Sequence, residues 1–118
     1  MMLQTVEKVD KPWGYELIFA HTERYAGKIL HVDAHQALSL QYHQDKDETL
    51  FLLEGEYDLV VEEDGELVER RIRAGESYHI PAGTRHRMVA GPGGCDILEV
   101  STPELDDVVR LEDRYGRV

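Results

Sequence analysis

The sequence has few of the features that direct a chain to a membrane or to an oxidising compartment. It contains a single cysteine, Cys95, so an intrachain disulfide is excluded and a reducing cytoplasm is the expected location. Its densest apolar stretch runs only from Leu50 to Leu53, far short of the roughly 20 residues that span a bilayer. The opening MMLQTVEKVD has no basic segment followed by an apolar run, so no signal peptide is predicted.

Basic residues are also scarce in this chain. There are 13 lysines and arginines against 24 acidic residues, which gives a formal net charge of −11. Nonspecific binding to nucleic acid or to an anionic membrane requires an excess of positive charge, so we expect neither partner. An anionic small molecule stays possible, because the local charge of a pocket can oppose the net charge of the protein.

The middle of the chain consists of short apolar or alternating runs separated by turn residues. Asp64-Gly65, between two such runs, is the strongest hairpin signal. Strands at this spacing, without helical spacers, predict an all-β sandwich or closed barrel, and the length of 118 residues fits a single domain over residues 1–118. The predicted strands are residues 27–32, 38–43, 49–53, 57–62, 67–72, 77–80, 86–89 and 96–101.

The tail of the chain has a different pattern. Thr102-Pro103 is followed by acidic residues and then by Val108, Val109 and Leu111, which predicts a short capped helix at the C-terminal end. Arginines further along the tail would complement the dipole of such a helix.

Two clusters contain residue types that bind metals. Gln41 and His43 are two residues apart, so on a strand they share a face, and Glu48 follows across a turn that could bring it beside His43. The second cluster, GESYHIPAGTRH, ends in His86. Imidazole nitrogens, a carboxylate and an amide oxygen suit a divalent transition metal. Spacing alone leaves open that these are ordinary exposed side chains of turns.

The two clusters resemble the two motifs of the cupin superfamily. The first motif usually has two histidines separated by one residue, then a glutamate and a glycine; the second has a glycine, a proline, a glycine and a histidine. The corresponding residues here are Gln41, His43, Glu48 and Gly55, followed by Gly75, Pro81, Gly83 and His86. This resemblance implies a cupin double-stranded β-helix, a jelly-roll barrel.

One branch of that superfamily has glutamine at the position of Gln41. The run LSLQYH is similar to that of type II mannose-6-phosphate isomerases, whose cupin domain usually follows a mannose-1-phosphate guanylyltransferase. The segments KPWGYE, ERYAGKILHV and DDVVRLEDRYGR are similar to further parts of that family, so the resemblance covers nearly the whole chain. No glycine-rich phosphate-binding loop is present, and guanylyl transfer is not expected.

The resemblance implies an aldose–ketose isomerase for a sugar or sugar phosphate, with mannose 6-phosphate and fructose 6-phosphate as the first substrates. The implied cofactor is a divalent transition metal: zinc, manganese, cobalt, nickel or iron. Its implied ligands are Gln41, His43, Glu48 and His86. Lys28 and Arg114 are the candidate catalytic residues, and the candidate substrate-binding residues are Lys46, Arg85 and His79.

The loop from Gln44 to Asp47 departs from this family, which usually has histidines and an arginine there. Lys46 keeps a positive charge but cannot form a bidentate phosphate contact, and Asp45 and Asp47 would repel a phosphate.

Two alternatives stay open. His43, Glu48 and His86 form the two-histidine, one-carboxylate set of non-haem iron oxygenases, which is consistent with a small cupin dioxygenase. The altered loop favours a non-catalytic cupin that binds a metal or a sugar. We also expect a homodimer, because pairing protects exposed edge strands.

Overall fold

Two long antiparallel strands, β5 (Glu48–Glu63) and β8 (His86–Ser101), form the centre of the protein. The structure, a computed structural model, describes residues 2–118. The two strands pair from Glu48 opposite Ser101 to Val61 opposite His86. The remaining strands are β1 (Glu7–Lys11), β2 (Gly14–His21), β3 (Ala26–Val32), β4 (Leu40–Tyr42), β6 (Glu66–Arg73), β7 (Ser77–Ile80) and β9 (Val109–Glu112).

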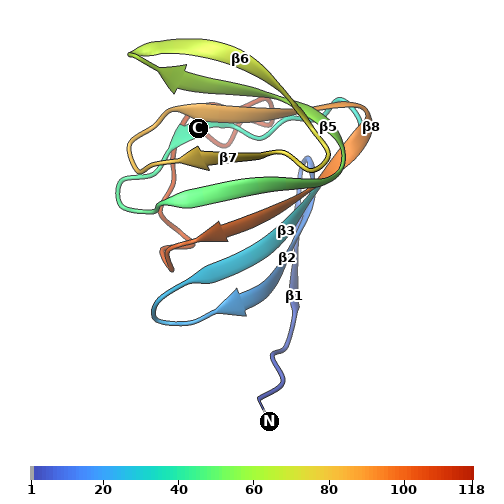
Figure 1. The fold of residues 1–118 in the computed structure, drawn as a ribbon, viewed down its shortest axis with the longest axis vertical. Helices are drawn as coiled ribbons and strands as arrows, with labels where there is room; N and C mark the ends of the chain where they lie inside the picture. Colours follow the sequence, from blue (N-terminus) through green and yellow to red (C-terminus); the bar gives the residue numbers. More distant parts are fainter. Residues whose placement is uncertain (1) are drawn as a thin grey trace.

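This pair of long strands is shared by two sheet halves that curl toward each other (Figure 1). In one half the beginning of β5 pairs with β7, and the end of β8 pairs with β3, which continues to β2 and β1. In the other half the end of β5 pairs with β6, and the start of β8 pairs with β4, which continues to β9. The predicted all-β barrel is confirmed.

The two halves meet where β5 and β8 bend. The register shifts twice between Leu52 and Tyr57, and Gly55 adopts a φ of +85° within this stretch. A Cβ atom on Gly55 would collide with the carbonyl oxygen of Gly94, which itself has a φ of +72°. Glycine is therefore required for the close approach of the two strands at the bend.

Apolar side chains form a core between the two halves. They occupy alternate positions of the strands, as expected for sheets with one face toward the core. At Lys28, Glu48 and Glu99 the inward position is held by a buried charged residue instead. The fully buried apolar side chains include Leu30, Val32, Leu50, Leu52, Leu59, Val61, Ile80, Met88 and Ile97.

The sequence predicted most of these strands, but in shorter pieces. The strand predicted at residues 77–80 is found as β7. Residues 49–53 and 57–62 are two parts of β5, and residues 86–89 and 96–101 are two parts of β8, because each long strand continues through the bend. The strands β1 and β2 were not predicted.

The predicted C-terminal helix is wrong. Residues 102–118 contain no helix, and Val109–Glu112 forms β9, which pairs with the edge of β4. The neighbouring valines favour a strand, and the open edge of β4 supplies the hydrogen-bond partners that decide between the two structures. Within residues 2–118 no helix is long and apolar enough to cross a membrane.

Gly55→Ala should destabilise the protein more than Gly75→Ala. Both glycines have positive φ, +85° and +89°, but a Cβ on Gly75 would have no atom within 4 Å. Gly75→Ala should cost only the backbone strain, roughly 1–2 kcal/mol. Gly55→Ala should cost a further 1–3 kcal/mol or so, the range for overpacked sites. Urea unfolding measures both, and equal losses would contradict the tight approach at the bend.

Candidate metal centre

Three polar side chains from separate segments of the chain meet inside the barrel. His43 follows β4, Glu48 begins β5 and His86 begins β8. Oε1 of Glu48 lies 3.1 Å from Nε2 of His86 and 3.4 Å from Nε2 of His43. The three potential ligand atoms all lie within 4.8 Å of one another, and all three residues are buried. The structure thus brings together three of the four residues that the sequence suggested as metal ligands.

Both imidazole rings are oriented by backbone carbonyl groups. Nδ1 of His43 lies 2.5 Å from the carbonyl oxygen of Asp107, and Nδ1 of His86 lies 2.9 Å from that of Thr84. A carbonyl oxygen only accepts, so each Nδ1 carries the hydrogen in this arrangement. Each neutral ring then presents the lone pair of Nε2 to the centre of the cluster, as metal-binding histidines do.

The atoms at the centre of this cluster need a partner. Nε2 of His43, Nε2 of His86 and both carboxylate oxygens of Glu48 are buried and have no hydrogen bond within the described chain. Leaving such groups unsatisfied is costly, and a divalent cation would satisfy them together. Two imidazole nitrogens and a carboxylate fit zinc, manganese, cobalt, nickel or iron.

Glu48 is held in the ionised form that a metal ligand needs. Burial raises the pKa of its carboxyl group. The nearby imidazoles of His43 and His86, together with the charge of Lys46, outweigh burial and hold the pKa of Glu48 well below its usual range. Nζ of Lys46 lies 3.3 Å from Oε2, so it contacts the oxygen that the two histidines leave free.

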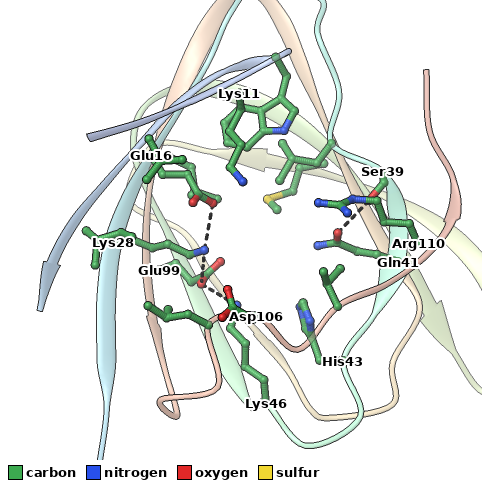
Figure 2. A pocket seen from close by; sticks show the side chains of 18 of the residues that line it. Lys11, Glu16, Lys28, Ser39, Gln41, His43, Lys46, Glu99, Asp106 and Arg110 are labelled. Carbon is green, nitrogen blue, oxygen red and sulfur yellow. Dashed lines mark hydrogen bonds and ion pairs between the residues drawn. The ribbon is translucent and has the colours of Figure 1, made fainter. Parts of the chain in front are cut away.

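Gln41 lines a cavity that also reaches His43, but its amide oxygen is turned away from the cluster. That oxygen accepts a hydrogen bond of 2.8 Å from the hydroxyl of Ser39. The amide nitrogen is therefore directed into the cavity (Figure 2). An amide nitrogen does not bind a metal, so Gln41 would join the ligands only after rotation of its amide.

A row of alternating charges leads from Glu48 along the cavity wall. Nζ of Lys46 lies 3.0 Å from Oε2 of Glu99, and Nζ of Lys28 lies 3.8 Å from the same oxygen. Lys28 also donates a hydrogen bond of 2.9 Å to Glu16 (Figure 2). The structure thus places Lys28 and Lys46, two residues that the sequence suggested, in the cavity beside the histidine–glutamate cluster.

The charges of this row influence one another. Burial raises the pKa of Glu99, and the charge of Glu48 raises it further. The charges of Lys28 and Lys46 lower this pKa but do not outweigh the other two effects, so it stays above its usual value. Burial lowers the pKa of Lys46, but the charges of Glu99 and Glu48 outweigh burial and raise it. Lys46 therefore remains an ammonium ion between two carboxyl groups.

The cavity has a volume of about 580 Å³, within the usual range for small-molecule sites. Its walls include Trp13, Met88 and Leu38, while the cluster residue His43 lies at one end (Figure 2). The sequence did not identify several of its charged lining residues, among them Lys11, Glu16, Glu99, Asp106 and Arg110. Alternation could have identified Glu99, which shares the inward face of β8 with Ile97.

Asp107 holds the loop in front of the cluster. Its carboxylate accepts hydrogen bonds from the backbone N–H groups of Gln44, Asp45 and Lys46 at 2.9, 2.7 and 2.9 Å. These bonds lower the pKa of Asp107. Its carbonyl oxygen meanwhile orients His43, so one residue of the C-terminal segment fixes both the loop and a candidate metal ligand. Only the three-dimensional pairing of this segment reveals that role.

His79, suggested as a substrate-binding residue, lies outside the cavity. Ile80, its neighbour on β7, is fully buried, so His79 faces outward by strand alternation. Its Nε2 lies 2.7 Å from a carboxylate oxygen of Asp47 on the exposed surface. The sequence could not establish which face of β7 points inward.

Arg85 and Arg114 also lie outside the cavity lining. Arg85 directs its guanidinium to Glu62, whose carboxylate oxygen is 3.4 Å away. Arg114 is exposed and donates a hydrogen bond of 2.9 Å to the carbonyl oxygen of His35. The suggested catalytic or substrate-binding roles of these two arginines are therefore not supported by their positions.

The sequence also matches a known family over nearly its full length. A family model described as the C-terminal part of mannose-6-phosphate isomerase matches residues 1–113. The chain belongs to this family. The prediction from the motif residues is thereby confirmed.

Members and relatives of the mannose-6-phosphate isomerase C-terminal family include longer proteins. The chain is 38% identical over 117 residues to the mannose-1-phosphate guanylyltransferase ManC of Salmonella typhimurium strain LT2. It is 37% identical over 117 residues to a mannose-1-phosphate guanylyltransferase of Escherichia coli K12. Each match covers 94% of this chain and 23% of the relative, so the chain spans about a quarter of their length.

Two solved structures show the fold of this family member. KdgF from Halomonas sp. superposes with a TM-score of 0.72 at 22% identity, covering 85% of this chain and 88% of KdgF. Oxalate decarboxylase from Bacillus subtilis gives a TM-score of 0.82 at 16% identity, covering all of this chain and 33% of that protein. Both are cupins, and the predicted cupin fold is confirmed.

If the cluster is a metal site, His43→Ala and His86→Ala should each remove most of the metal that the protein takes up on loading. Loss of either imidazole takes away one of three ligands, so metal affinity should fall at least about tenfold. Metal content after loading with zinc or manganese and dialysis, measured by mass spectrometry, checks this. His79→Ala is the matched control and should keep its metal. Full metal content in both cluster variants would show that the ligand assignment is wrong.

Proposed function

We propose that the chain is a metal-dependent aldose–ketose isomerase for sugar phosphates, with mannose 6-phosphate and fructose 6-phosphate as its first substrates. The observation that carries this proposal is one cavity whose lining brings His43, a member of the buried histidine–glutamate cluster, together with Lys28 and its carboxylate partners. The family description is in accord with this reaction. The longer relatives are named as guanylyltransferases, but guanylyl transfer is not proposed for this chain.

His43, Glu48 and His86 are the residues that would hold the metal. A divalent cation bound there supplies Lewis-acid stabilisation of negative charge on the substrate oxygens. Lys46 keeps Glu48 oriented by contacting its second oxygen at 3.3 Å. Gln41 presents its amide nitrogen to the cavity and can donate a hydrogen bond to a substrate oxygen.

Lys28 is the proposed proton-transfer residue. Isomerisation moves protons between two adjacent carbons and between their oxygens, which requires an acid–base group next to the substrate. Lys28 lines the cavity, and its Nζ lies 2.9 Å from Oε2 of Glu16 and 3.8 Å from Oε2 of Glu99. A lysine between two carboxyl groups can exchange protons with a substrate and with its neighbours. Glu16 then acts as a positioning residue for Lys28.

The metal-loaded protein should interconvert mannose 6-phosphate and fructose 6-phosphate. The reaction can be followed by coupling glucose-6-phosphate formation to a dehydrogenase through added phosphoglucose isomerase, starting from mannose 6-phosphate. Removal of the metal with a chelator should abolish turnover, and addition of manganese, cobalt or zinc should restore it. Absence of turnover with every loaded metal, over a panel of sugar phosphates and free sugars, would overturn the proposal.

Lys28→Met should lower kcat by roughly 10²–10⁴-fold, the usual contribution of a general acid–base group. Methionine keeps the volume but removes the exchangeable protons, and the metal ligands are untouched. The exposed Lys8→Met is the matched control and should retain normal kcat. Metal content and thermal unfolding of both variants separate a chemical effect from a folding defect. Normal kcat in Lys28→Met would remove Lys28 from the mechanism.

The ligand set itself favours a second candidate. Two histidines and one carboxylate form the set of non-haem iron oxygenases, and the turned amide oxygen of Gln41 favours three ligands over four. Iron in the purified protein together with oxygen consumption would support that reading. Bound metal without any turnover would support a non-catalytic metal- or sugar-binding cupin. The predicted homodimer, cytoplasmic location and single domain stay predictions.

A further inference from the structure

Arg110 is a half-buried arginine without a partner. The other half-buried arginines of the described chain, Arg85, Arg87 and Arg117, each donate to a carboxylate or carbonyl oxygen. The side chain of Arg110 makes no hydrogen bond or ion pair within residues 2–118, and its Nε is shielded from solvent. An unpaired guanidinium that has lost part of its hydration is costly, so its retention in a cavity points to a ligand.

Lys11 is a second cation in the same cavity. It ends β1, is half-buried and lines the cavity together with Arg110. Its ammonium group points into the cavity, where Figure 2 also shows Arg110 beside Ser39 and Gln41. Lys11 forms no ion pair with any described residue, whereas Lys28 and Lys46 are both paired with carboxylates.

The carboxylates of the cavity do not neutralise these two cations. Glu16 and Glu99 are already paired with lysines. Asp106 lies on the side of Lys46 and Glu99, away from Lys11 and Arg110 (Figure 2). Glu7 shares β1 with Lys11 but lies four residues earlier, about 13 Å along an extended strand. Uncompensated positive charge therefore collects at one part of a cavity in a strongly acidic protein.

We propose that Arg110 and Lys11 form an anion subsite that binds the phosphate group of the sugar phosphate. The identity of the ligand rests on the proposed function. The planar guanidinium of Arg110 can donate two parallel hydrogen bonds to phosphate oxygens, and Lys11 adds a mobile point charge. Gln41, with its amide nitrogen toward the cavity, adds a neutral donor beside Arg110.

This assignment differs from the one that the sequence suggested, Lys46 and Arg85. Lys46 already contacts Glu48 at 3.3 Å and Glu99 at 3.0 Å, so its charge is compensated. Arg85 is turned to Glu62 outside the cavity. Binding of a phosphate there would require breaking existing ion pairs, whereas Arg110 and Lys11 have no pair to break.

The test is calorimetric binding of glucitol 6-phosphate, compared with glucitol, to the metal-loaded protein. Glucitol 6-phosphate has no carbonyl group and cannot be isomerised, so binding is measured without turnover. The phosphate should tighten binding to the unmodified protein, and Arg110→Gln should weaken binding of glucitol 6-phosphate by roughly 10–100-fold, as expected for lost hydrogen bonds to a charged group. Lys11→Gln should cause a smaller loss, and Arg110→Lys should recover part of the affinity.

Arg71 is an exposed arginine paired with Asp58, so Arg71→Gln is the matched control. This variant should bind glucitol 6-phosphate as tightly as the unmodified protein does. Metal content of each variant must be unchanged, which separates loss of the subsite from loss of the fold. Unchanged binding in Arg110→Gln, weakening in Arg85→Gln instead, or no effect of the phosphate on the unmodified protein would each overturn the subsite. Arg110-dependent binding without isomerase activity would overturn the proposed function but support the subsite. Isomerase activity with an unchanged KM in Arg110→Gln would support the proposed function but overturn the subsite.

Discussion

The bend in the β5–β8 pair is the constraint on which the rest of the structure depends. In the ladder Glu48 lies opposite Ser101, whereas His86 lies opposite Val61. Val61 lies thirteen positions after Glu48, so in a flat sheet Glu48 and His86 would be roughly 40 Å apart. In the protein Oε1 of Glu48 lies 3.1 Å from Nε2 of His86. Curling the two sheet halves against each other, with glycine at the bend, therefore creates the site.

Burial of charge is the second constraint, and it follows from the first. Once Glu48 lies inside the barrel its carboxylate needs positive charge nearby, which Lys46 provides at 3.3 Å from Oε2. Lys46 in turn contacts Glu99, Glu99 lies near Lys28, and Lys28 is bound by Glu16. Replacing such a row by apolar residues is often neutral or stabilising, so stability alone does not explain it. A row of mutually compensating charges that opens onto a cavity is in accord with the proposed proton exchange with a substrate.

The sequence predicted the elements of the site better than their orientation. Motif spacing and alternation predicted the barrel and the meeting of His43 with its two partner ligands, because both follow from local patterns. Alternation gives two faces for each strand but does not say which face is inside. For that reason Lys28, which is buried, and His79, which is exposed, could not be distinguished from the sequence. Arg110 was missed because its position depends on the pairing of β9 with β4, two strands that are far apart in the sequence.

That pairing links two properties of the site that are distant in the sequence. Arg110 lies opposite Gln41 because β9 adds to the edge of β4. The same segment places the carbonyl group of Asp107 against Nδ1 of His43, and the carboxylate of Asp107 against the loop that carries Lys46. A helix at these residues would form its hydrogen bonds internally, so the carbonyl and N–H groups of the segment would not be available to β4 and His43. The orientation of His43, a candidate metal ligand, and the position of the unpaired Arg110 therefore both depend on the pairing of the C-terminal segment with β4 as an edge strand.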